Sequence, residues 1–316
     1  MKTAIVALAL ASLAIAGPLP AASQTPPPAT SPATLPLAVQ FDLPSKITGR
    51  TYRIYVSKPV TSAPKDGYPV LYVLDADIAF ATASSQVILG SLTGKGANLV
   101  VGVAYPNFIA TTTLRGRDLT PSQPNSAARA TGGFGKVGPE DYGGADDFHR
   151  FMMEELRPLI AQMNKVDSGN QSLMGYSLGG LFTLHVMFHH PEAYRSYVAG
   201  SPSIWWNDRE VLGGEAGFAK AVRAQEVAPR LLITSDRWEQ DVNAPGMPLA
   251  GAARDGALAS MTSARMVDNA KELAARLKAL KGGPGYEVVY TLFPEETHET
   301  GIPASTSRGV AFVGRR

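Results

Sequence analysis

The feature that most constrains the fold is a short apolar strand that passes through a glycine-rich turn directly into an apolar helix. The strand is expected over residues 171–174, the turn reads GYSLGG over residues 175–180, and the helix follows over residues 181–188. A turn this tight needs glycine on both sides of its central residue, because side chains there would collide with the adjacent strand and helix. The segment therefore predicts a sheet whose strand end leads straight into a packed helix.

The rest of the chain repeats this alternation of strand and helix. Several short segments are near-continuous apolar runs, which suits strands covered on both faces. Strands are expected at residues 51–56, 70–74, 99–104, 171–174, 196–199, 231–234 and 286–292. Apolar side chains at helical spacing predict helices over residues 145–163 and 257–280. The alternation predicts an α/β fold, with a mostly parallel central sheet and helices on both faces.

Residues 105–144 break this pattern. They are rich in Gly, Pro, Thr and Ser and show little periodicity, over a stretch much longer than ordinary connections. We expect a substrate-facing loop here rather than a scaffold element.

The glycine-rich turn also carries chemistry. A G-x-S-x-G sequence between a strand and a helix is typical of the nucleophile elbow of α/β hydrolases. The turn lifts the Ser177 hydroxyl clear of the sheet and places the Leu178 N–H at a helix N-terminus, where it can stabilise an oxyanion. Chance could supply the bare motif in a chain with 31 glycines, but the flanking strand and helix are the context that the motif requires. Ser177 is the predicted nucleophile.

One of the five histidines fits the general base, which in α/β hydrolases follows the nucleophile and the acid along the chain. The other four precede the serine or follow it on the same helix: His149, His185, His189 and His190. Neighbours in sequence do not face one site on a helix, so the pair at residues 189–190 predicts no metal site. His298 lies in the loop after the last expected strand and is the predicted base.

The acid of such a site should leave the carboxyl end of an intermediate strand. Three carboxylates follow the strand expected over residues 231–234: Asp236, Glu239 and Asp241. The acid accepts the Nδ1–H of the base, fixes its tautomer and stabilises the imidazolium. The residues alone rank Asp236 and Glu239 equally, with Asp241 behind them, and all three could simply solvate a loop.

Further segments extend the comparison beyond the elbow. They are VLYVLD at residues 70–75, RGRDLTP at 115–121, GSPSIWW at 200–206, and His298. With these segments the chain resembles the putative-esterase (esterase D-like) family of α/β hydrolases, over residues 39–312. That family includes siderophore trilactone esterases, feruloyl esterases and mycolyltransferases, and the resemblance is greatest to the siderophore esterases of the enterobactin and bacillibactin type.

The resemblance implies two more site residues. The family carries its acid in a G-x-x-[DE] pattern, which selects Glu239 here and puts Asp236 at the glycine. Some siderophore esterases work with a serine and histidine dyad. The family's second oxyanion donor follows an early Leu-Asp-Gly turn and falls on the N–H of Asp77, with Ala76 in place of the glycine. Two carboxylates at positions 75 and 77 without further ligands predict no metal site.

Five residues are candidates for the substrate pocket: Tyr176, Arg115, Arg117, Trp205 and Trp206. The two arginines could meet an acidic substrate, or Arg117 could pair with Asp118 and order the long loop. The tryptophans could line a pocket for an aromatic acyl group or pack in the core.

Composition and the N-terminus limit the class of protein. With 316 residues, 45% of them apolar, and a net charge of +2, the chain suits one large domain and offers no field for nucleic acid. It has no cysteine, which excludes disulfides and thiolate ligands. Residues 1–22 have the pattern of a signal peptide, whose apolar run over residues 4–16 is shorter than the roughly 20 residues that span a bilayer.

We therefore expect export to the periplasm or the medium, a proline-rich linker over residues 23–36, and a single α/β-hydrolase catalytic domain over residues 37–316. The predicted activity is ester hydrolysis through an acyl-enzyme, without a cofactor, on a small-molecule ester such as a siderophore trilactone. The alternatives are a feruloyl or acetyl polysaccharide esterase, an acyltransferase with the same triad, and a non-catalytic binding protein on this fold.

Overall fold

The computed structural model describes residues 31, 33–94, 96–125, 141–244 and 250–315. Residues Leu35–Arg316 form one compact unit, and the description below concerns that unit. The predicted signal peptide and most of the predicted linker lie outside the described residues.

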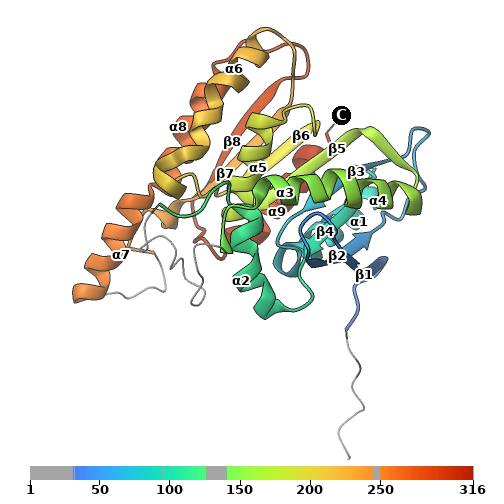
Figure 1. The fold of residues 1–316 in the computed structure, drawn as a ribbon, viewed down its shortest axis with the longest axis horizontal. Helices are drawn as coiled ribbons and strands as arrows, with labels where there is room; N and C mark the ends of the chain where they lie inside the picture. The colour runs from blue at the N-terminus through green and yellow to red at the C-terminus, as the bar shows by residue number, and fades with distance from the viewer. Residues whose placement is uncertain (1–30, 32, 95, 126–140, 245–249, 316) are drawn as a thin grey trace, which may run out of the picture. The chain divides into compact units, whose positions relative to one another are not determined.

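The described residues contain one eight-stranded sheet in the order β1-β2-β4-β3-β5-β6-β7-β8 (Figure 1). Neighbours from β4 to β8 are parallel, while β1 and β2 extend the sheet in antiparallel pairs. The strands are β1 (Ala38–Pro44), β2 (Thr51–Ser57), β3 (Tyr68–Val73), β4 (Leu99–Ala104), β5 (Val166–Tyr176), β6 (Ser196–Gly200), β7 (Arg230–Asp236) and β8 (Glu287–Phe293). All seven predicted strands are present, and β1 is an additional edge strand.

Helices cover both faces of the sheet, as predicted. α1 (Ala76–Leu92) and α9 (Gly301–Val313) pack on one face. The other face carries α3 (Ala145–Phe151), η2 (Met152–Leu156), α4 (Arg157–Met163), α5 (Leu178–His189), α6 (Glu215–Arg223) and α8 (Met266–Lys278). Alternate residues of β3 supply the two cores, since Val70 and Tyr72 lie in one and Leu71 and Val73 in the other. This double burial explains the continuous apolar runs of the inner strands.

The two helices predicted from apolar spacing differ in detail from those of the structure. The segment 145–163 is helical throughout, with the π-helical turn η2 in its middle. The helix predicted over residues 257–280 is two helices, α7 (Gly251–Ala264) and α8, separated by Arg265 in the left-handed region at φ +46°. A left-handed residue ends the helical path even where apolar spacing continues.

The expectation that residues 105–144 form only a loop is wrong for their first part. α2 (Phe108–Leu119) lies there, and the turn after it leads to residues 126–140, which lie outside the described residues. Tertiary contacts stabilise α2, because Thr111 Oγ1 donates to Asp77 Oδ2 at 2.7 Å and Arg115 pairs with Asp75. Short 3-10 segments complete the unit at η3 (Trp206–Gly214) and η4 (Arg237–Glu239).

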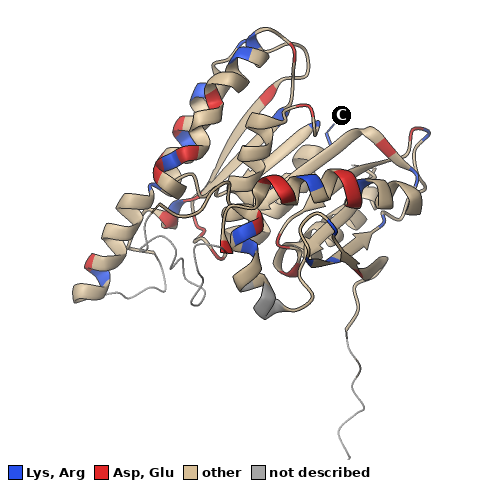
Figure 2. Ribbon diagram, in the orientation of Figure 1, with Lys and Arg blue, Asp and Glu red and all other residues tan. Residues whose placement is uncertain are grey.

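Charged residues of both signs alternate over the described helices and loops (Figure 2), in keeping with the net charge of +2. Within the described part of the chain, no helix combines the length and apolarity needed to cross a bilayer.

Candidate active site

Ser177 occupies a strained turn between β5 and α5. Its backbone angles are φ +59° and ψ −118°, a conformation that a non-glycine residue adopts only where the surroundings impose it. The flanking glycines are required by space, because a Cβ on Gly175 would lie 2.2 Å from the Gly179 carbonyl oxygen and one on Gly180 2.7 Å from that of Gly200. The turn presents Ser177 at the carboxyl end of the sheet, and Leu178 begins α5.

The end of β6 and the segment that follows it form hydrogen bonds with this turn. The Ser177 N–H donates to Gly200 O at 2.9 Å, and the Ser203 N–H donates to Ser177 O at 3.1 Å. The Ser203 hydroxyl lies 3.4 Å from Ser177 Oγ. Ser203 was not a predicted site residue, although the GSPSIWW segment that contains it was recognised in the sequence.

His298 follows β8 and forms a hydrogen bond through Nδ1 to Glu239 Oε1. Glu239 is 6% exposed, and its second oxygen accepts hydrogen bonds from Ser201 Oγ at 2.8 Å and from the Asp236 N–H at 3.0 Å. With Nδ1 committed to the carboxylate, Nε2 is the imidazole nitrogen that can exchange a proton with a reacting group.

The other two candidate carboxylates contact different partners. Asp236 is fully buried and forms hydrogen bonds with Tyr176 Oη and, at 2.9 Å, with Ser201 Oγ. Burial raises the pKa of Asp236 to about 6, against the opposing effect of the Tyr176 hydrogen bond. Asp241 Oδ1 accepts from the backbone and side chain of Asn243. Of the three, Glu239 is the one in contact with the imidazole.

Tyr176 contacts His298. Its hydroxyl donates to the His298 carbonyl oxygen at 2.7 Å, and the two rings lie 5.0 Å apart. Tyr176 also lines the cleft beside Ser177.

The second predicted oxyanion donor, the N–H of Asp77, belongs to the first turn of α1, where backbone N–H groups lack an acceptor within the helix. Asp75 directly before the helix has φ +48°. The two carboxylates of this segment bind different partners, Asp75 to Arg115 and Asp77 to Thr111. Among the described residues, no group of three or more His, Asp or Glu side chains is arranged to hold a metal ion.

The predicted pocket residues divide into different environments. Both nitrogens of the Arg115 fork donate to Asp75 at 2.8 Å, so this guanidinium has a carboxylate partner inside the cleft. Trp205 lines a cleft beside Ser177. Trp206 does not, because it is 2% exposed and its ring packs 5.1 Å from Tyr142 in the core.

The structure gives Asp118 partners that were not predicted. Its carboxylate binds Arg50 at 2.8 Å and the hydroxyls of Tyr52 and Tyr105 at 3.0 and 2.9 Å. Asp118 therefore connects α2 to residues of β2 and to the residues that flank β2 and β4. Arg117 is not among the residues that line either cleft at Ser177.

Two clefts meet at Ser177 and His298. The first has a volume of about 240 Å³ and is largely apolar, with Leu74, Ile78 and Met174 among its lining residues. The second has a volume of about 260 Å³ and is lined on one side by Trp205, Trp238, Met261 and Met266. An ester whose carbonyl lies at Ser177 can therefore extend in two directions.

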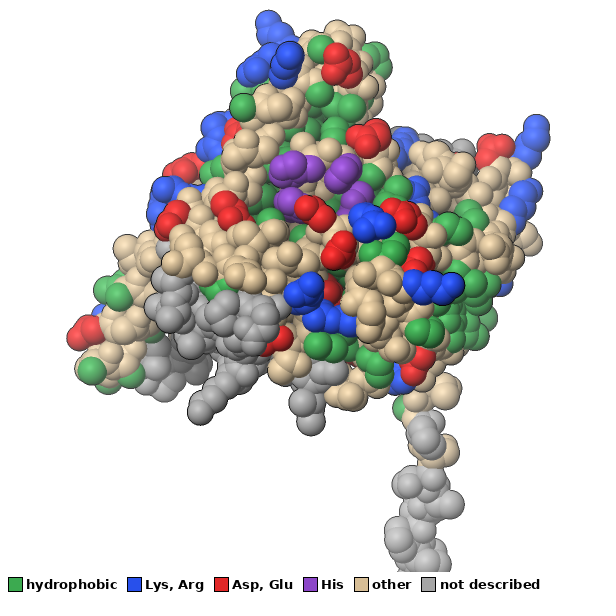
Figure 3. All heavy atoms as spheres, viewed as in Figure 1, with side chains coloured by type: hydrophobic (Ala, Val, Ile, Leu, Met, Phe, Trp, Pro, Cys, Tyr) green, Lys and Arg blue, Asp and Glu red, His purple; other side chains and the backbone are tan. Residues whose placement is uncertain are grey.

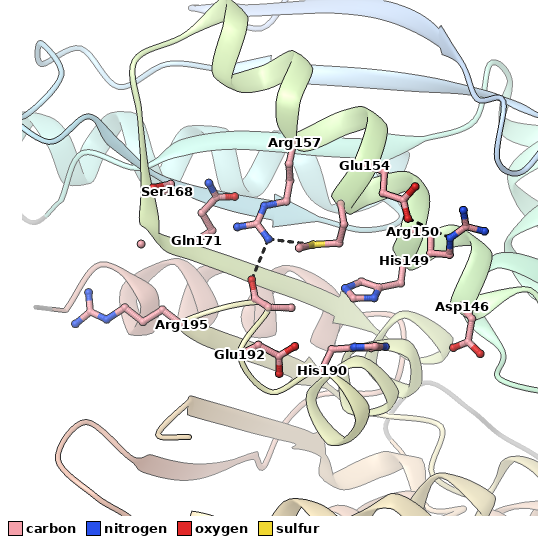
Figure 4. A pocket seen from close by; sticks show the side chains of 13 residues that line it. Asp146, His149, Arg150, Glu154, Arg157, Ser168, Gln171, His190, Glu192 and Arg195 are labelled. Atoms are coloured by element: carbon pink, nitrogen blue, oxygen red, sulfur yellow. Dashed lines mark hydrogen bonds and ion pairs between the residues drawn. The ribbon is translucent and has the colours of Figure 1, made fainter. Parts of the chain in front are cut away.

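A larger cavity of about 660 Å³ lies along the amino-terminal half of β5, where Ser168, Gly169 and Gln171 line it (Figure 4). The distance from Gln171 to Tyr176 along the strand is roughly 17 Å at 3.3 Å per residue. Its lining includes His149, His190 and Arg157, and Figure 3 shows histidine side chains gathered on this face of the molecule. Neither Ser177 nor His298 lines this cavity, whereas both residues line each of the two smaller clefts.

Comparison with known proteins shows the family of the chain. The sequence pattern of the family described as "Putative esterase" matches residues 45–244. The ferri-bacillibactin esterase BesA of Bacillus subtilis is 33% identical over 85% of this chain and 86% of its own length. The siderophore triacetylfusarinine C esterase of Aspergillus fumigatus is 30% identical over 89% and 94%. The crystal structure of the BES protein from Bacillus cereus superimposes with a TM-score of 0.73 at 30% identity, over 91% of this chain and all of that one.

A strand-turn-helix serine beside a histidine and glutamate pair, on a mostly parallel sheet, defines a serine hydrolase of the α/β-hydrolase type. The chain belongs to the esterase family named above, and it is a carboxylic ester hydrolase. The resemblance noted in the sequence is confirmed.

Proposed function

We propose that this chain hydrolyses a siderophore ester, with Ser177 as nucleophile, His298 as general base and acid, and Glu239 as the residue that orients His298. The observation that carries the assignment of roles is the meeting of the strained Ser177 turn with an imidazole whose Nδ1 is bound to a buried carboxylate. The similarity to BesA and to the triacetylfusarinine C esterase supports the substrate class.

The chemistry follows from these positions. Ser177 Oγ attacks the ester carbonyl carbon while His298 Nε2 takes the hydroxyl proton, and the carbonyl electron pair moves onto oxygen. The N–H groups of Leu178 and Asp77 are the donors proposed for that oxyanion. Collapse of the tetrahedral species breaks the bond to the alcohol oxygen, which leaves with the proton from His298. Water then repeats the sequence on the acyl-enzyme and releases the acid.

The shape of the site favours an ester with bulk on both sides of the scissile bond. The clefts of about 240 and 260 Å³ diverge from Ser177, and an acetyl group would leave most of one cleft empty. Siderophore trilactones, which carry a large group on each side of every ester, suit this arrangement better than acetylated polysaccharide.

The test is a hydrolysis panel with ferric and iron-free siderophore trilactones, feruloyl esters and acetylated xylan, run with the wild type and Ser177→Ala. We expect the trilactones to give the highest kcat/KM, and Ser177→Ala to abolish turnover. A wild type that turns over feruloyl or acetyl esters but no trilactone would refute the substrate class. Transfer of the acyl group to an added alcohol in preference to water would identify an acyltransferase.

We further propose that the catalytic unit acts after export, in the periplasm or the medium. The support is the apolar run over residues 4–16 with its small residues before Gly17. Fractionation of expressing cells tests this: a processed chain outside the cytoplasm is expected, and an unprocessed cytoplasmic chain would contradict it.

A further inference from the structure

Beneath the base lies a second carboxyl group that ester hydrolysis does not use directly. Asp236 is fully buried at the end of β7, lines neither cleft, and occupies the position at which the family's G-x-x-[DE] pattern has glycine. The chain makes room for it, because a Cβ on Gly301 would lie 2.2 Å from atoms of the Asp236 carboxyl group. A buried carboxyl needs partners, and those of Asp236 lead to the catalytic residues.

Two hydroxyl groups connect Asp236 to the base and to its acid. Tyr176 Oη contacts both Asp236 Oδ2 and the His298 carbonyl oxygen, and Ser201 Oγ contacts both Asp236 Oδ2 and Glu239 Oε2. Ser201 is fixed at a left-handed backbone position, φ +34°, directly after β6. The network therefore joins three strand ends, those of β5, β6 and β7, below one imidazole.

We propose that Asp236 is a positioning residue of the catalytic site, which holds His298 through Tyr176 and shares the Ser201 hydroxyl with Glu239. This inference rests on the proposed roles of Ser177, His298 and Glu239.

The hydroxyl groups of Tyr176 and Ser201 have fewer protons than the network has contacts. Each hydroxyl has one proton to donate, so Tyr176 and Ser201 cannot fill four acceptor contacts with an ionised Asp236. A proton on Asp236 Oδ2 supplies a third donor: Asp236 donates to Tyr176 Oη, Tyr176 donates to the His298 carbonyl oxygen, and Ser201 donates to Glu239, so that three of the four contacts have a proton. Among the described residues Asp236 Oδ1 has no hydrogen-bond partner, which an ionised carboxylate tolerates less well than a neutral acid.

The titratable groups that face Asp236 influence its pKa. They are Tyr176 of β5, Glu239 of η4, Tyr290 of β8 and His298. Burial, with the charge of Glu239, raises the pKa of Asp236 to about 6 despite the Tyr176 hydrogen bond. Below that pH the donor chain from Asp236 through Tyr176 to the His298 carbonyl oxygen is complete. Above that pH Asp236 is a second negative charge near His298, and the charges of the two groups interact.

The test measures kcat and KM against pH for Asp236→Asn and Tyr176→Phe, with a short chromogenic ester. Asp241→Asn is the matched control. It removes a carboxylate that follows η4, and that carboxylate contacts Asn243 rather than His298. We expect Asp236→Asn to shift the acid limb of kcat/KM to lower pH by about one pH unit, since the imidazolium loses a nearby negative charge. Its KM should not change, because Asp236 lines neither cleft.

Tyr176→Phe should lower kcat roughly tenfold, because the carbonyl of His298 loses its donor and the base is less well oriented. A purely structural role would leave the acid limb where it is. Wild-type pH profiles for Asp236→Asn together with a wild-type kcat for Tyr176→Phe would overturn the proposal.

Two further measurements keep the result interpretable. If Asp236→Asn does not fold, as judged by circular dichroism, Tyr176→Phe and Ser201→Ala decide the question, since each removes one hydroxyl of the network, and wild-type kcat in both would refute it. If Ser177→Ala hydrolyses the ester as fast as the wild type, the proposed nucleophile is wrong, which is a different failure from an unaltered Asp236→Asn.

Discussion

The stability of the folded state should fall steeply in mild acid because of His149. This residue lies on α3, is 6% exposed, and has an Nε2 without a hydrogen-bond partner among the described residues. Its ring lies 4.8 Å from that of His190, and Figure 4 shows both at the cavity that Arg157 also lines. Burial lowers the pKa of His149 from 6.5 to about 4, and the positive charges of His190, His185 and Arg157 act in the same direction.

The size and sign of the effect follow from linkage. In the unfolded chain His149 binds a proton near pH 6.5, whereas in the folded protein it does so only near pH 4. Between these values the unfolded state holds the extra proton, so stability is fully present above pH 6.5 and is lost as the pH falls towards 4. A difference of about 2.5 pH units at 1.36 kcal/mol each corresponds to a loss of about 3 kcal/mol.

The assay is urea unfolding at pH 8 and at pH 4.5, followed by circular dichroism. The difference in unfolding free energy between the two pH values should be smaller by about 2–3 kcal/mol in His149→Phe than in the wild type. His189→Gln is the control, because it removes an exposed histidine at the end of α5, next to His190 in the sequence. Equal acid losses in the wild type and His149→Phe would refute the reasoning, whatever the absolute stabilities.

Three further perturbations follow from the structure. Glu239→Gln should lower kcat by about 10³-fold with little change in KM, because the imidazolium loses its buried carboxylate, as steady-state kinetics would show. Gly175→Ala should abolish activity and reduce soluble yield, because its Cβ would lie 2.2 Å from a carbonyl oxygen of α5; activity matching the wild type would contradict this. Asp118→Asn leaves Arg50 without its carboxylate and should lower the free energy of unfolding by about 3 kcal/mol in urea titrations.

The inner sheet and the serine turn could be predicted because local sequence determines them. Strands buried on both faces need continuous apolar runs, and the elbow needs glycines at fixed positions. β1 could not be found in the same way. It is an edge strand whose residues, such as Val39 and Gln40, are partly or fully exposed, and its pairing with β2 comes from distant contacts.

Helix α2 and the break at Arg265 were missed for related reasons. α2 contains three threonines and Gly116, which are weak helix formers, and it is stabilised by contacts to Asp75 and Asp77 that no local pattern reveals. At Arg265 the apolar spacing continues across the break, so periodicity alone joins α7 to α8.

Within the site, the motif and its flanking elements predicted Ser177 as nucleophile and chain order predicted His298 as base, but the residues alone did not choose between the candidate acids. Asp236 ends β7 and Glu239 ends η4, three residues later, and only the folded path of η4 brings Glu239 to the imidazole while Asp236 contacts Tyr176. The two tryptophans could not be told apart from the sequence either. Trp205 lines a cleft, whereas Trp206 packs in the core.

The most direct test of the account is covalent labelling of the nucleophile. Purified protein is treated with a fluorophosphonate, and intact mass and peptide mapping are followed alongside residual hydrolysis of a short ester. We predict one adduct per chain, on Ser177, with activity lost in proportion to labelling and neither adduct nor hydrolysis in Ser177→Ala. Undiminished hydrolysis by Ser177→Ala, or a labelled serine elsewhere that accounts for the activity, would contradict the central claim.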